Sequence, residues 1–145
     1  MAQVEKTVLV PYSPAQMYAL VDAPERYPEF LPWCGNVDLL SRDDTTTIAT
    51  LHIDYHGLRQ RFTTKNSKLF PTRMDIALVD GPFSHLEGSW HFIPLGSDAC
   101  KIEFRLNYTF SSHLLERIIA PVFSHIANTF VDAFVERAEK TYTLS

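Results

Sequence analysis

The stretch from residue 112 to residue 141 reads SHLLERIIAPVFSHIANTFVDAFVERAEKT and decides the fold. At about 100° per residue, helical periodicity places the main apolar positions on one line: Leu115, Ile119, Val122, Ile126 and Ala133. Further apolar residues widen this line to about half of the circumference: Ile118, Phe123, Ala127, Phe130 and Phe134. A surface helix normally needs a stripe a little over about 100° wide. We therefore expect a long helix that packs against more than one part of the core.

The chain before this helix shows the alternation of apolar and polar residues that is typical of strands. Strands are predicted at residues 4–10, 37–40, 47–55, 58–65, 73–78, 85–92 and 100–110. Two short helices separate the first strand from the others. Ser13 and Gln16 form a capping box with Pro14 at the first helical position, and Asp22 with Pro24 repeats the same start signal. The next segment, 27–34, is rich in aromatic residues and proline, which predicts a non-helical corner.

This order of elements predicts an α+β fold. An antiparallel sheet with one apolar face needs a helix laid across that face. We expect a curved sheet of about seven strands wrapped around the C-terminal helix, in a single domain spanning residues 1–145.

Composition and charge restrict the functional classes. The formal net charge of −4 gives no general attraction to nucleic acid, so no DNA partner is expected. Cys34 and Cys100 are too few for a zinc site built from cysteines, and free thiols are the simplest interpretation. No apolar run reaches 18 residues and no signal peptide is visible, which predicts a cytoplasmic protein.

Residues suited to catalysis are present but poorly arranged. His52 and His56 lie on one predicted strand without an evident third metal ligand. His85, Glu87 and His91 share a strand face that points outward, opposite to the aromatic face of the same strand. There is no glycine-rich phosphate loop, nucleophile elbow or paired-carboxylate motif. We expect neither an enzyme nor a metal site.

Three segments carry a resemblance to a known family. They are YPEFLPWC at residues 27–34, DGPF at 80–83 followed by the apolar face of 86–92, and the helix from 120 to 138. The order of elements resembles the helix-grip fold of the START and polyketide cyclase/dehydrase superfamily. The segments resemble its coenzyme Q-binding and ribosome association toxin (RatA) family.

The resemblance implies two roles. One is non-enzymatic binding of ubiquinone or a related isoprenoid lipid between sheet and helix, in support of respiration. The other is association with the large ribosomal subunit, which blocks subunit joining. A polyketide cyclase or dehydratase is a further alternative. No cofactor is expected apart from the bound lipid. Transient contact with the membrane would place the protein peripherally at the inner membrane.

The candidate ligand-binding residues are those expected to face the interior between sheet and helix, and ordinary core packing is the alternative. They are Tyr27, Phe30, Trp33, Phe62, Met74, Ile76, Phe83, Trp90, Phe92, Tyr108, Ile119, Phe123, Ile126 and Phe130. An apolar pocket with a few polar groups suits a quinone ring with an isoprenoid tail. Tyr27, Trp33 and Tyr108 are the candidate donors to a quinone carbonyl.

A row of basic residues is the candidate RNA contact. Arg59, Arg61 and Lys65 alternate on one strand, with Lys68 and Arg73 near in sequence. Such a strip can contact phosphate, although a solvated outer sheet face is the alternative.

Pro121 predicts a kink in the long helix, because it lacks an N–H for the Arg117 carbonyl. The segment before Pro121 is then a candidate lid over a lipid groove.

Overall fold

The computed structural model describes residues 2–142. The elements follow the expected order of one strand, two short helices, six strands and one long helix. They are β1 (Ala2–Val10), α1 (Pro14–Val21), the 3-10 helix η1 (Pro24–Glu29), β2 (Cys34–Arg42), β3 (Thr46–Tyr55), β4 (Leu58–Leu69), β5 (Arg73–Asp80), β6 (Phe83–Pro94), β7 (Cys100–Phe110) and α2 (His113–Tyr142).

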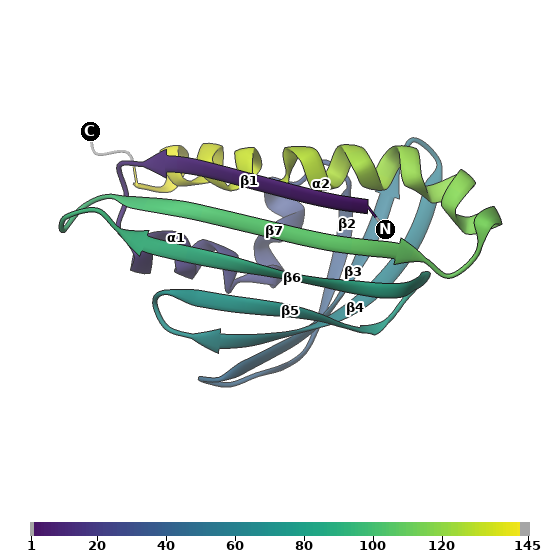
Figure 1. Cartoon of the computed structure of the whole chain (residues 1–145), viewed down its shortest axis with the longest axis horizontal. Helices are drawn as coiled ribbons and strands as arrows, with labels where there is room; N and C mark the ends of the chain where they lie inside the picture. The colour runs from purple at the N-terminus through teal and green to yellow at the C-terminus, as the bar shows by residue number, and fades with distance from the viewer. Residues whose placement is uncertain (1, 143–145) are drawn as a thin grey trace.

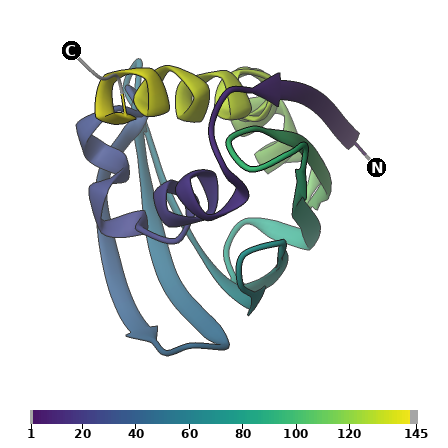
Figure 2. The same cartoon turned by 90° about the vertical axis from the view of Figure 1, so that its left-hand side faces the viewer.

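The seven strands form one antiparallel sheet in the order β1-β7-β6-β5-β4-β3-β2. The strands from β2 to β7 are neighbours in sequence and in space, and β1 closes the far edge against β7. The sheet curls around α2, which lies across its concave side, while α1 sits at one end of the curl (Figures 1 and 2). The predicted α+β fold with a curved seven-stranded sheet is therefore confirmed.

Helix α2 buries a continuous seam against the sheet. The buried positions recur at helical spacing: Ile119, Phe123, Ile126, Ala127, Val131, Phe134 and Ala138. The polar side of the helix faces solvent, as expected. Ile118, which we placed in the apolar stripe, is 51% exposed, and Leu114 before it is 67% exposed. The buried stripe is therefore narrower before Pro121 than the sequence suggests.

The segment between β1 and β2 confirms one start signal and corrects the other. The Ser13 hydroxyl accepts a hydrogen bond from the Gln16 N–H while the Gln16 side chain accepts from the Ser13 N–H, so the capping box is present. Asp22 does not cap the second helix; Ala23 occupies that position without a side-chain bond. Asp22 instead ends α1, and its carboxylate contacts β3 and β4.

Two expected boundaries also differ. The corner expected at residues 27–34 begins inside η1, because the 3-10 helix runs to Glu29. The strands expected at residues 73–78 and 85–92 are longer, because β5 runs to Asp80 and Phe83 already pairs with Phe110 as the first residue of β6. Both differences lengthen regular structure at the expense of loops.

Candidate functional site

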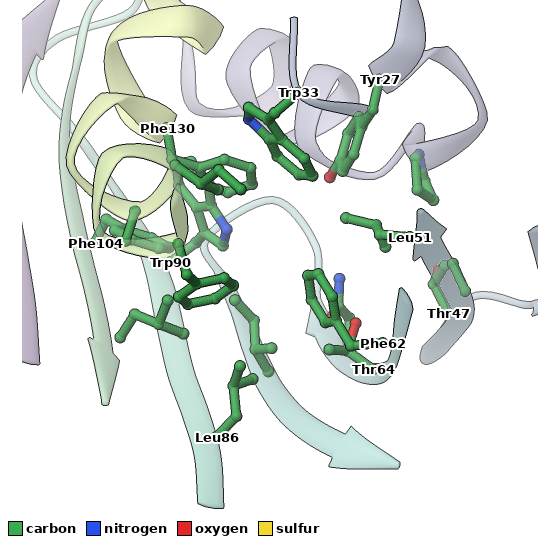
Figure 3. A pocket seen from close by; sticks show the side chains of 18 residues that line it. Tyr27, Trp33, Thr47, Leu51, Phe62, Thr64, Leu86, Trp90, Phe104 and Phe130 are labelled. Atoms are coloured by element: carbon green, nitrogen blue, oxygen red, sulfur yellow. The ribbon is translucent and has the colours of Figure 1, made fainter. Parts of the chain in front are cut away.

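A cavity of about 70 Å³ lies between the concave side of the sheet and α2 (Figure 3). Side chains from η1, from the segment before β2, from strands β3 to β7 and from α2 form its walls. The residues lining it are Pro24, Tyr27, Trp33, Thr47, Ala49, Leu51, Phe62, Thr64, Asn66, Ile76, Leu86, Trp90, Phe104, Leu106, Phe123, Ile126, Ala127 and Phe130.

Aromatic rings form much of the wall below α2. Phe130 of α2 packs against Trp33 with ring centroids 6.2 Å apart, and against Trp90 and Phe104 at 5.7 Å each. The three ring pairs are tilted, with their planes 39–47° apart, and aromatic pairs contribute about 0.5–1.5 kcal/mol beyond the burial of their area. The wall is therefore apolar and well ordered around the C-terminal half of α2.

The cavity also has a polar end, formed by β3 and β4. Thr47 and Asn66 are register partners across these strands, and Thr64 faces the cavity beside Asn66. The amide oxygen of Asn66 is buried and has no hydrogen-bond partner within residues 2–142. A buried polar atom without a partner is uncommon and calls for a physical explanation.

Tyr27 contributes its ring to the cavity, but its hydroxyl is already engaged. The hydroxyl donates to the Val21 carbonyl oxygen, which ties η1 to the end of α1. The pKa of Tyr27 is well above its usual range. Burial is the larger cause, and the nearby negative charge of Asp22 raises the pKa further. Tyr27 is thus a neutral phenol whose proton is committed to the backbone.

A buried ion pair is connected to the polar end through Thr47. Lys68 Nζ lies 3.0 and 3.2 Å from the two carboxylate oxygens of Asp22, and the Thr47 hydroxyl donates to the same carboxylate at 2.9 Å. The Lys68 side chain is only 3% exposed and that of Asp22 is 19% exposed. The charge of Lys68 is therefore balanced by that of Asp22, and this end of the cavity is polar but neutral.

The structure brings part of the expected ligand-binding set together around this cavity. The expected residues that line it are Tyr27, Trp33, Phe62, Ile76, Trp90, Phe123, Ile126 and Phe130. Those buried or packed elsewhere are Phe30, Met74, Phe83, Phe92, Tyr108 and Ile119. Tyr108, a candidate carbonyl donor, instead packs against Phe123 at 4.7 Å.

Sequence reasoning missed the small, aliphatic and polar members of the lining and one aromatic residue, Phe104. They are Pro24, Thr47, Ala49, Leu51, Thr64, Asn66, Leu86, Phe104, Leu106 and Ala127. Strand alternation contained a usable signal, since Thr64 and Asn66 follow Phe62 at a spacing of two. We had selected aromatic residues and overlooked polar residues on the same strand face.

The expected basic strip is smaller than the sequence suggests. Arg59, Arg61 and Lys65 are all exposed on β4, and Arg59, whose side chain is 84% exposed, also lies 3.7 Å from the Asp54 carboxylate. Lys68 does not belong to the strip, because it shares the inward face with Asn66 and binds Asp22. Arg73 lies on β5 and is paired with Asp75 at 3.0 Å.

The candidate acid–base residues lie on the outer face of the sheet. Arg105 and Asn107 donate to the Glu87 carboxylate, and these bonds, led by that of Arg105, lower the pKa of Glu87 to about 2. A carboxylate held in this state is a poor general base near neutral pH. His52 contacts Asp38 at 2.7 Å. Within residues 2–142, no group of three or more His, Cys, Asp or Glu side chains is placed to hold a metal ion.

By length and composition alone, helix α2 could cross a membrane. This holds although no uninterrupted apolar run in the sequence reaches 18 residues. The core helix of a soluble protein passes the same test, and α2 packs across the sheet. Its composition therefore reflects at least in part the seam that it buries.

Comparison with known proteins places the fold in a defined group. Residues 10–135 match the family described as polyketide cyclase / dehydrase and lipid transport. Two solved structures show the same architecture. A solution structure of an 18 kDa Caulobacter crescentus protein has a TM-score of 0.74 at 30% identity, covering 99% of this chain and 100% of that one. The Zhui aromatase/cyclase from a Streptomyces species has a TM-score of 0.77 at 17% identity, covering 96% and 94%, which shows a shared fold alone.

Among the curated relatives, two toxins are more similar in sequence. The persistence and stress-resistance toxin PasT of Escherichia coli O6:H1 is 40% identical over 143 residues, which cover 99% of this chain and 90% of that protein. The ribosome association toxin RatA of Vibrio cholerae is 38% identical over 142 residues, covering 98% and 99%. The mitochondrial coenzyme Q-binding protein COQ10 homolog B of Xenopus laevis is 29% identical over 135 residues, covering 90% of this chain and 55% of that protein.

Proposed function

The chain belongs to the polyketide cyclase/dehydrase and lipid transport family, with RatA, PasT and COQ10 homologue relatives, and on this premise we propose that it binds an apolar isoprenoid ligand without catalysing a reaction. The ligand class we propose is ubiquinone or a related lipid. The observation that carries the proposal is the aromatic cavity with one polar end, between the sheet and α2. An apolar pocket with a few placed polar groups is the usual form of a small-molecule site. Each buried CH₂ of an isoprenoid tail would contribute about 0.8 kcal/mol.

The size of the cavity requires its walls to move on binding. Its volume of about 70 Å³ is smaller than the ~150 Å³ cavity that takes up benzene in an engineered core. A substituted quinone ring is larger than benzene, so ring and tail need a wider opening. We infer that α2 moves away from the sheet, because side chains alone would leave a narrow space.

The contacts of α2 indicate which part of it moves. The polar contacts that tie the helix to other elements, within residues 2–142, come from its C-terminal half. Asp132 lies 3.7 Å from Lys6, Arg137 pairs with Glu29, and the Tyr142 hydroxyl donates to the Gln16 carbonyl oxygen. The cavity-lining residues of α2 begin at Phe123, just after Pro121. The segment from His113 to Ala120 is therefore an arm beside the cavity, and we propose that it swings outward.

Amide hydrogen exchange tests this motion. We expect faster exchange in residues 113–120 than in residues 124–140, and the difference should shrink in Pro121→Ala, which restores a backbone donor. Equal protection on both sides of Pro121 in the native protein would contradict the arm.

Extraction of the gently purified protein with organic solvent, followed by mass spectrometry, tests ligand binding directly. We expect an isoprenoid quinone to co-purify, and Ala127→Leu to reduce the amount because the added carbons fill the cavity. Ala77→Leu is the matched control, since Ala77 is exposed on β5 and does not line the cavity. Absence of any quinone, together with no saturable binding of added quinone, would refute the proposal.

A second candidate function is association with the large ribosomal subunit. Two relatives at 38–40% identity carry toxin names, one of them ribosome association toxin. The exposed Arg61 and Lys65 on the outer face of β4 supply a small phosphate-binding surface. We propose that this surface, not the cavity, contacts the ribosome.

Sucrose-gradient profiling after overexpression tests the ribosomal role. We expect the native protein to co-sediment with the large subunit and lower the 70S peak, and Arg61→Glu/Lys65→Glu to abolish both effects. Lys101→Glu/Lys140→Glu makes the same change in net charge, from −4 to −8, at other exposed or half-buried positions. An unchanged 70S peak with the native protein would rule this function out.

The expected setting is the cytoplasm, with transient contact at the inner membrane where the lipid resides. Leu114 and Ile118, exposed on the arm of α2, supply an apolar surface for that contact. The alternative of a cyclase or dehydratase finds less support, because the polar groups at the cavity end are neutral or paired.

A further inference from the structure

Asn66 carries the only buried side-chain nitrogen or oxygen atom within residues 2–142 that has no hydrogen-bond partner. It lies on the inward face of β4, between Thr64 and Lys68, and its buried amide oxygen has no partner within residues 2–142. An apolar residue would fill the same position without leaving an unpaired acceptor. The unpaired oxygen can accept a hydrogen bond only from a donor such as a quinol hydroxyl, whereas the NH₂ group of the same amide can donate to a quinone carbonyl. The amide therefore points to a bound molecule with an oxygen-bearing head group.

The surroundings of Asn66 restrict the chemistry of that molecule. The nearest charged groups on the same side of the sheet, Asp22 and Lys68, neutralise each other at 3.0 Å. A carboxylate or phosphate head would find no free cation there, and the cost of burying a charge would remain. A neutral head group that carries oxygen fits: the Asn66 NH₂ can donate to a carbonyl, and its oxygen can accept from a hydroxyl.

We propose that Asn66 binds the oxygen of a neutral head group and so fixes the direction of the ligand in the cavity. The head lies at the β3–β4 end beside Thr47 and Thr64, and the tail runs toward Phe62 and Phe123. These two rings stand 5.9 Å apart, and Phe123 lies two residues after Pro121 in α2. This inference rests on the proposed binding of an apolar ligand and adds the residue that recognises its head group.

Two matched probes separate head-group recognition from tail burial. Decylubiquinone carries a quinone head, and decylbenzene carries the same tail on a ring without oxygen. Both tryptophans of the chain, Trp33 and Trp90, line the cavity, so quenching of their fluorescence reports quinone binding and decylbenzene is measured by displacement. Palmitate serves as the probe with an anionic head.

The native protein should bind decylubiquinone about tenfold more tightly than decylbenzene, which is the effect of one hydrogen bond. Asn66→Leu should remove this difference by weakening decylubiquinone binding alone. The same variant should raise the Tm without ligand by about 3 °C, because it removes an unpaired buried acceptor. Palmitate should bind the native protein more weakly than decylubiquinone.

Control variants make the outcome decisive. Thr63→Val changes a neighbouring residue whose hydroxyl pairs with Thr50 at 2.7 Å and which does not line the cavity, so both affinities should stay unchanged. Asn66→Val, with a side chain that strands favour, repeats the test with a different shape. If both Asn66 variants bind decylubiquinone as the native protein does, head-group recognition by Asn66 is wrong while ligand binding stands. If the native protein binds neither decylubiquinone nor decylbenzene, the proposed function itself fails.

Discussion

Asp22→Ala should be among the most destabilising substitutions at a charged residue of this protein. The Asp22 carboxylate accepts two contacts from Lys68, at 3.0 and 3.2 Å, and a hydrogen bond from Thr47 at 2.9 Å. These contacts connect the end of α1 to β3 and β4. Removing the carboxylate leaves the Lys68 ammonium without a counter-charge in a site where its side chain is only 3% exposed.

The expected loss in the free energy of unfolding follows from the burial of Lys68. Breaking a buried ion pair by removing one partner costs about 3–5 kcal/mol, because the remaining charge is uncompensated. We expect the upper part of this range for Asp22→Ala. Lys68→Met should cost about 1–3 kcal/mol, because Asp22 is 19% exposed and keeps its bond to Thr47. The double variant Asp22→Leu/Lys68→Met should cost less than the two single variants together.

Urea unfolding followed by circular dichroism measures these free energies. Asp75→Ala is the matched control, since the Arg73–Asp75 pair has side chains 48% and 47% exposed. An exposed pair contributes about 0–1 kcal/mol, and salt screens it. The loss in Asp22→Ala should persist at 1 M salt. A loss below about 1 kcal/mol, equal to that of the control, would refute the reasoning.

Three further predictions concern the sheet and the thiols. Gly88→Ala should destabilise the protein by about 1–3 kcal/mol in urea unfolding, since its Cβ would lie 2.3 Å from the Arg105 carbonyl oxygen; a loss under about 0.5 kcal/mol would contradict this close approach. The Glu87 pKa of about 2 lies below the usual 4.5, so its contribution to stability is fully present above pH 4.5 and is lost as the pH falls through 2. Because Glu87 and Arg105 are more than a third exposed, this contribution should stay below about 1 kcal/mol, and Glu87→Gln should remove the slope; an unchanged slope would assign it to other groups. Burial raises the pKa of Cys34 and Cys100 to about 11, so iodoacetamide at pH 8 should label the native protein far more slowly than the unfolded one, and equal rates would show that the thiols are accessible.

Hydrophobic periodicity predicted most of the fold, because the spacing of apolar residues reflects the same burial that stabilises the fold. The alternation in residues 100–110 gave β7 with its observed bounds, and the sheet face of the long helix followed from helical spacing. The error at Asp22 has a physical cause: a carboxylate before a helix is a good N-cap, but a lysine and a threonine distant in sequence bind it better. Such tertiary contacts leave no local signal.

The cavity was harder to predict than the core, because both use apolar residues on the same strand faces. Met74 and Phe92 were expected to bind ligand, yet both are fully buried outside the cavity lining. Small changes in sheet curvature decide which inward side chains meet a void and which meet another side chain. The polar residue Asn66 is more informative, since an amide on an inward strand position is a poor choice for ordinary packing.

Strand β4 allows the two candidate functions to coexist in one small fold. Its residues Phe62, Thr64 and Asn66 line the cavity, while Arg61 and Lys65 face outward. Because successive side chains of a strand point to opposite faces, a substitution on one face leaves the chemistry of the other in place. Asn66→Leu should therefore keep any binding to the ribosome, and Arg61→Glu/Lys65→Glu should keep any binding of quinone. If either substitution abolished both activities in a folded protein, the two functions would have to be coupled through β4 itself.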